Sequence, residues 1–179
     1  MRRAPITKPA TKAKVTSISP ALGAINSQAQ NVDSHGRIHV ILNRRLSDGD
    51  PYSYASSSGF HYHYFRDLSG SWHESNTGIA GGQRPKLLFD TDDNAYLVYV
   101  DKSGLLKFFV AKASSTWTDW KQAYSYPSSS SGERVCSETV LDPDALIERD
   151  TLSAQLQLCA PAGANVSELR VIDVVRSYQ

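Results

Sequence analysis

Apolar residues along this chain follow the two-residue alternation of β-strands, and no long stretch carries the stripe of an amphipathic helix. The alternation is clearest between residues 60 and 66, where histidine and tyrosine side chains follow one another. Strands are predicted at 37–43, 60–66, 95–100, 105–110, 155–159 and 169–175. A hairpin turn is expected at 101–104, and one helical turn at 143–148. The pattern therefore predicts an all-β fold.

A short motif occurs twice in the chain and begins a third time. In residues 32–40 and 89–97 an apolar residue precedes an aspartate, a polar turn follows, and a strand comes next. The leading aspartates are Asp33, Asp90 and Asp142, the last in front of a longer loop. Their spacings of 57 and 52 residues leave room for four strands in each copy.

The residues of the motif suit a tight turn. An aspartate at its start can accept hydrogen bonds from backbone N–H groups inside the turn. Gly36 and Asn94 occupy the positions where we expect a positive φ, which these residue types tolerate best. Trp72 and Trp117 follow the second strand pair of each copy and offer large faces to fill the space between neighbouring units.

Four strands in a repeat of this length predict antiparallel β-propeller blades, and a β-sandwich is the alternative. We expect a disordered basic arm at 1–14 and about three blades over 15–179, at roughly 15–80, 81–127 and 128–179. Closed propellers have about four to eight blades. The chain therefore represents an incomplete propeller, either truncated or closed by self-association through exposed blade faces.

Charge and hydropathy narrow the possible functions. The net charge is +1, which argues against a dedicated nucleic-acid binder. No apolar run matches a secretory signal or a membrane span, so the chain as written is expected in the cytosol. Cys136, Cys159 and the glycosylation sequon at Asn165 would instead suit a secreted protein. The sequence leaves open whether the two cysteines are bonded.

Several segments resemble, in order, the neuraminidase-repeat-like propellers of the polysaccharide lyase type. They are 26–40, 61–72, 83–90 and 105–120, and the resemblance extends over about residues 20–178. This family includes ulvan lyases and the lyases that release rhamnose from glucuronate. The resemblance implies a secreted seven-bladed propeller that carries out β-elimination at a uronic acid. In the family a histidine or tyrosine removes the C5 proton, a tyrosine serves as acid, and an arginine neutralises the carboxylate.

The resemblance places this chain in the later blades, whereas the family's catalytic residues lie in earlier ones. No Tyr-Pro-x-Phe segment followed by Arg-x-Gly-x-Ser-Gly occurs here. We therefore expect the C-terminal part of a carbohydrate-active propeller, in contact with an acidic polysaccharide, without cofactor or metal and inactive by itself. The alternatives are a non-catalytic glycan- or protein-binding segment and a truncated product without function.

A uronate site needs cations beside the sugar carboxylate. Arg84 is the leading candidate because it precedes Pro85, which favours an extended backbone, at the start of an inner strand. The alternative is a surface arginine paired with an acid of the next blade. Further cations near predicted strand ends are Arg44, Arg45, Lys86 and Arg134, of which Arg44 is also a candidate sugar contact.

Histidines and amides complete the candidate set. His61 and His63 lie on one face of a predicted strand. They could act as an acid–base pair or pack as imidazoles inside the protein. Two histidines alone make an incomplete metal site. Asn26, Gln28 and Asn43 are placed at ends of inner strands, where amides can bind sugar hydroxyls or, equally well, a neighbouring backbone. His39, inside an apolar strand, is predicted to belong to the core.

Overall fold

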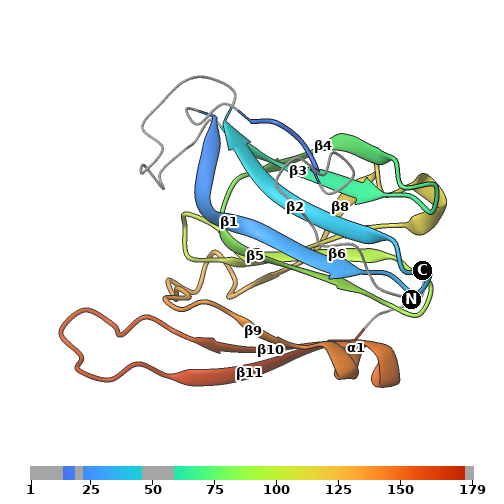
Figure 1. Ribbon diagram of the computed structural model, residues 1–179. Helices are drawn as coiled ribbons and strands as arrows, with labels where there is room; N and C mark the ends of the chain where they lie inside the picture. The colour runs from blue at the N-terminus through green and yellow to red at the C-terminus, as the bar shows by residue number, and fades with distance from the viewer. Residues whose placement is uncertain (1–13, 19–21, 46–58, 176–179) are drawn as a thin grey trace, which may run out of the picture.

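The computed structural model describes residues 14–18, 22–45 and 59–175, which form three antiparallel sheets (Figure 1). The first sheet contains β1 (Gly23–Val32), β2 (Ile38–Arg45), β3 (Gly59–Arg66) and β4 (Trp72–Ala80). The second contains β5 (Gln83–Phe89), β6 (Ala95–Val100), β7 (Leu106–Ala111) and β8 (Trp120–Tyr126). The third contains β9 (Val140–Asp142), β10 (Thr151–Gln157) and β11 (Leu169–Val175).

Strand order within each sheet follows the order of the chain. Such antiparallel meanders have the form of propeller blades, and the predicted all-β fold of incomplete propeller blades is confirmed. The exact blade limits stay a prediction. The expected basic arm at 1–14 lies outside the described residues, apart from Lys14. Within the described ranges, no helix has the length and apolar character needed to cross a membrane.

The two aspartate turns are built as the sequence predicts. The Asp33 carboxylate accepts hydrogen bonds from the backbone N–H groups of His35 and Arg37, and Asp90 repeats this with the residues two and four positions on. Gly36 has the predicted positive φ of 80°. In the second turn Asp93, with φ 59°, takes this conformation instead of Asn94. The prediction for Asn94 was wrong by one residue, because Asp93 is the third residue after its aspartate, as Gly36 is.

The third copy of the motif starts a helix rather than a tight turn. Asp142 caps α1 (Pro143–Arg149), since its side chain accepts hydrogen bonds from the backbone N–H groups of Asp144 and Ala145. The helix is longer than the single turn that the sequence suggests. It extends further because Ala145 and Leu146 are buried in the structure and stabilise it by packing.

Two hydrophobic cores hold the three sheets together. Between the first and second sheets the buried residues are Ile41, Ile79, Leu87, Phe89, Ala95, Leu97, Tyr99, Ala111 and Trp117. Between the second and third they include Phe108, Leu106, Leu146 and Leu156. Trp117 fills the space between blades as predicted, whereas Trp72 on β4 is only partly buried and belongs to neither core.

The outer face of the third sheet is exposed in the part of the chain that the structure describes. Val140, Leu169, Val171 and Val175 on this face are each more than 60% exposed. Cross-strand pairs align Val140 and Val171 with Gln155, and Leu169 with Gln157, and both glutamines are also exposed. The face thus exposes apolar side chains among polar ones, and self-association through it stays a prediction.

Candidate functional site

A β-bulge at the start of β5 sets the position of Arg84. Gln83 pairs with Val100 and Lys86 with Val98, so that Arg84 and Pro85 together face Tyr99. Arg84 has a φ of 49°, and the extended backbone predicted for it was wrong. The bulge outweighs the influence of the following proline, because an extra residue must be accommodated there and the strand bends to do so. The Arg84 side chain is 55% exposed.

Arg84 and Lys86 both bind the carboxylate of Glu138. Arg84 Nη1 lies 3.0 Å from Glu138 Oε2, and Lys86 Nζ contacts the other oxygen, Oε1. Glu138 lies just before β9 in the third sheet. The alternative role predicted for Arg84, pairing with an acid of the next blade, is therefore realised here. The hydrogen bond from Lys86, and then the contacts with Arg84, hold the pKa of Glu138 below its usual range.

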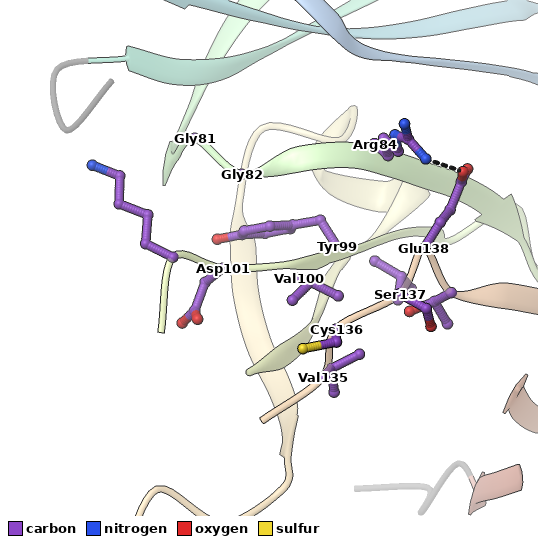
Figure 2. A pocket seen from close by; sticks show the side chains of 13 residues that line it. Gly81, Gly82, Arg84, Tyr99, Val100, Asp101, Val135, Cys136, Ser137 and Glu138 are labelled. Carbon is purple, nitrogen blue, oxygen red and sulfur yellow. Dashed lines mark hydrogen bonds and ion pairs between the residues drawn. The ribbon is translucent and has the colours of Figure 1, made fainter. Parts of the chain in front are cut away.

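The ion pair lies between two hollows of the surface. One hollow, about 470 Å³ in volume, extends from Gly81 and Gly82 past Tyr99 to Glu138 (Figure 2). The second, about 420 Å³, is lined by Gln28, Arg84, Pro85, Lys86 and Glu138. Arg84 and Glu138 line both hollows. Two of the predicted contacts, Arg84 and Gln28, therefore come together at one site.

A glycine pair forms one wall of the larger hollow. A side chain at Gly81 would collide with the amide of Asn43, and one at Gly82 would collide with the Tyr99 ring. His61 is behind the same wall, where its Nε2 accepts a hydrogen bond of 3.3 Å from the Gly82 backbone N–H. Asn43 and His61 are 3% and 0% exposed. They support the wall from inside the protein, and neither reaches the hollow.

Two buried titratable groups beside the glycine pair, His61 and Tyr99, are neutral at pH 7. Burial lowers the pKa of His61 to about 4 and raises the pKa of Tyr99 to about 12, with a smaller effect on Tyr99 from the charge of Asp101. The Tyr99 hydroxyl already donates a hydrogen bond of 3.1 Å to the carbonyl of Ala80. His61 and Tyr99 are thus engaged in supporting the fold rather than placed as an exposed acid–base pair.

The remaining predicted contacts lie elsewhere. His63 is buried in a line of hydrogen bonds, with its Nε2 2.9 Å from His39 Nδ1 and His39 Nε2 3.2 Å from Asp33. The predicted core position of His39 is confirmed, at 0% exposure. Arg44 points to the face of β2 opposite Asn43, where it contacts the residues Tyr62, Tyr64 and Glu74. The side chains of Asn26 and Arg45 fall outside the described residues, and Arg134 donates to the Ser103 carbonyl.

A second group of polar residues joins the turns of the first two sheets. Single ligand-type atoms of Asp33, His35 and Asp93 lie within 4.8 Å of one another. The Arg37 guanidinium, however, is 2.5 Å from Asp33 and 3.5 Å from Asp93, and Ser34 also donates to Asp93. Because a guanidinium already neutralises these carboxylates, we interpret the group as an ion-pair network between sheets rather than a metal site.

A disulfide bond between Cys136 and Cys159 orders the segment that carries Glu138. The backbone N–H of Cys136 donates to the Gln157 carbonyl at the end of β10, and that of Cys159 donates to Arg134. The question that the sequence left open is thereby answered: the cysteines are bonded. The bond places the residues before Glu138 against the third sheet, so that the carboxylate can reach Arg84.

Removal of this disulfide should lower the free energy of unfolding by about 3 kcal/mol, because the closed loop restricts the unfolded chain. The bonded cysteines are 23 residues apart. Urea unfolding of the Cys136→Ser/Cys159→Ser double variant would measure the loss. Reduced wild-type protein is the control, because it should unfold at the same urea concentration as the variant. Equal midpoints for the oxidised and reduced protein would contradict the prediction.

Four residues of the site were not predicted from the sequence: Glu138, Gly81, Gly82 and Tyr99. The adjacent glycines in front of Arg84 were a usable signal, because consecutive glycines mark close approach of other groups to the backbone. Glu138 lies in an irregular segment with no periodicity. Only the folded chain brings it within reach of a strand more than 50 residues away.

Comparison with solved structures supports the fold. The chain is similar to part of the crystal structure of polysaccharide lyase Uly1, with a TM-score of 0.54 and 15% identity over 86% of this chain. It spans 29% of the length of that lyase. A fucose lectin from Kordia zhangzhouensis, bound to methyl-fucoside, matches 84% of this chain and 98% of its own at 13% identity and a TM-score of 0.42, too low to support an inference. Neither the protein-family models nor the curated proteins include a match.

Proposed function

We propose that this chain contacts an acidic, uronate-containing polysaccharide as the C-terminal part of a propeller resembling the uronate polysaccharide lyases. The observation that carries the proposal is the convergence of Arg84 and Lys86 on one carboxylate between two open hollows. The likeness of the fold to part of a polysaccharide lyase supports a carbohydrate ligand. The negative charge that the two cations bind selects an acidic sugar among carbohydrates.

The site has the parts needed to hold a uronate. A guanidinium can bind a carboxylate through two parallel hydrogen bonds, and a neighbouring ammonium adds a second charge. Gln28 lines the smaller hollow beside them and is exposed, so its amide is available to a sugar hydroxyl as donor and acceptor. The volumes of the hollows, about 470 and 420 Å³, are in the range of small-ligand sites.

The proposed role is substrate contact rather than elimination. β-Elimination requires a base within reach of the C5 proton, in addition to cations at the carboxylate. The histidine and the tyrosine beside the larger hollow, His61 and Tyr99, are 0% and 6% exposed and are hydrogen-bonded to the backbone. Mixtures of this chain with a glucuronate polysaccharide should therefore show binding without the ultraviolet absorbance of an unsaturated uronate. A rise in that absorbance would instead make the chain catalytic.

We also propose that the protein works outside the cytosol. Disulfide bonds persist in oxidising compartments and are rare in reducing ones. The bond between Cys136 and Cys159 supports this location, which agrees with an extracellular polysaccharide as partner.

Loss of the two cations should abolish most of the binding. In Arg84→Gln/Lys86→Gln the affinity for glucuronate oligosaccharides should fall by at least about tenfold, because each cation supplies a charged hydrogen bond. Isothermal titration calorimetry with oligoglucuronate would measure it. Lys121→Gln is the matched control, since Lys121 is 73% exposed on β8 and pairs only with Asp119 among the ion pairs of the described residues. Equal losses in both variants would contradict the proposal.

A further inference from the structure

We infer that Glu138 occupies the position of the ligand's carboxylate and must leave Arg84 and Lys86 before an acidic sugar can bind. The inference rests on the proposed function and adds to it a role for Glu138, which would set the affinity of the site for acidic sugars. Each Glu138 oxygen contacts a different cation, Oε2 with Arg84 and Oε1 with Lys86. A uronate carboxylate offers the same two oxygens to the same two donors.

Glu138 is free to move without leaving a buried charge behind. Its side chain is 38% exposed, and those of Arg84 and Lys86 are 55% and 35% exposed. If Glu138 turns toward solvent, water can hydrate its carboxylate. The carboxylate of the ligand then takes its place beside Arg84 and Lys86, so that neither cation loses its partner. Exchange of one carboxylate for another at such a site is close to balanced in free energy, since surface ion pairs are worth little.

Displacement of Glu138 would also change the shape of the site. Arg84 and Glu138 line both the hollow beside Gly82 and the hollow beside Gln28. The paired side chains are thus the shared boundary of the two hollows. With Glu138 turned away, the hollows would meet across Arg84 and form one groove, which suits a chain of sugars better than a single residue.

A tethered carboxylate competes with a free one for the same two cations. Because Glu138 is held beside the cations by the Cys136–Cys159 bond and the start of β9, its effective concentration there is in the range of mM or above. The wild type should therefore bind acidic oligosaccharides weakly. Neutralising this one carboxylate should strengthen binding of charged sugars and leave the binding of neutral sugars unchanged.

The test compares Glu138→Gln with Glu133→Gln by titration calorimetry against oligoglucuronate and against a neutral oligoglucose of equal length. Glu133 is the matched control because it lies in the same loop, is similarly exposed at 39%, and pairs with Arg170 instead. Glu138→Gln should bind oligoglucuronate about tenfold more tightly than the wild type, with the neutral sugar unaffected. Glu133→Gln should bind like the wild type.

Each other outcome has a defined meaning. If the wild type binds oligoglucuronate and Glu138→Gln binds equally or less tightly, the inference is wrong while the proposed function stands. The same holds if both glutamate variants gain equally, because the gain would then reflect net charge. If neither the wild type nor Glu138→Gln binds, the proposed function fails and the inference fails with it. An unchanged urea midpoint of Glu138→Gln shows that altered binding does not come from altered folding.

Discussion

Acidification from pH 6.5 toward pH 4 should destabilise this protein steeply, by about 2.7 kcal/mol in the free energy of unfolding per pH unit. Two buried histidines cause the effect. Burial lowers the pKa of His61 to about 4, and burial together with the nearby His39 lowers the pKa of His63 to about 3. Both side chains are at most 1% exposed, so that water cannot stabilise their charged forms in the folded protein.

The direction of the effect follows from the proton balance. In the unfolded chain both histidines have the ordinary pKa of 6.5 and take up protons below it. The folded protein does not bind these protons until the pH reaches about 4 for His61 and about 3 for His63. The stability is therefore complete above pH 6.5 and is lost as the pH falls, by about 1.4 kcal/mol per unit for each histidine.

Urea unfolding at several pH values between 7 and 4 would measure this slope. The variants His61→Phe and His63→Phe keep an aromatic ring at each site and remove one titrating group each. Each should lower the slope by about 1.4 kcal/mol per pH unit, whatever it does to the stability at pH 7. In the double variant the remaining slope should come from His39, whose pKa burial also lowers. A wild-type free energy of unfolding that stays level over this interval would contradict the prediction.

Local chemistry made much of the fold predictable. Strands follow from two-residue alternation. The turn at Asp33 follows from an aspartate whose carboxylate accepts a hydrogen bond from the backbone N–H two residues on, that of His35. The same rule identified Asp142, but the residues after it form a helix, because Pro143 suits a helix start and Leu146 is buried by tertiary packing. The sequence contains the cap, whereas the residues that bury Leu146 belong to the core between the second and third sheets.

The site was only partly predictable, for a related reason. Arg84 was identified from its charge and place, but its backbone conformation depends on the bulge between the pairs Gln83–Val100 and Lys86–Val98. The partner of Arg84 was expected only as an unnamed acid of the next blade. His61 and His63 were recognised as a pair on one face, and the register of β3 places that face inward, where both side chains are at most 1% exposed. Periodicity identifies a face but does not indicate what covers it.

Replacement of Trp117 by alanine should remove about 4 kcal/mol from the free energy of unfolding, because a large buried side chain leaves a cavity between two sheets. Trp117 is 2% exposed, and its ring is 4.6 Å from that of His39 and 5.1 Å from that of Phe65, measured between centroids. The Arg37 guanidinium lies over the indole, 4.7 Å from its centroid. The indole N–H donates a hydrogen bond of 2.8 Å to the Asp93 carbonyl in the second turn.

The variant thus removes the contacts that Trp117 makes with the first sheet and with the Asp93 turn of its own sheet. Trp72→Ala is the matched control, since Trp72 is only partly buried on β4 and lies outside both cores. Its loss should be clearly smaller, at about 1 to 2 kcal/mol by the apolar area that it buries. Trp117→Phe separates the packing of the ring from the hydrogen bond of the indole N–H. It keeps most of the ring but leaves the Asp93 carbonyl without its donor. Urea unfolding of the three variants should rank the losses as Trp117→Ala, Trp117→Phe and Trp72→Ala, and equal losses for the two alanine variants would show that Trp117 does not join the sheets.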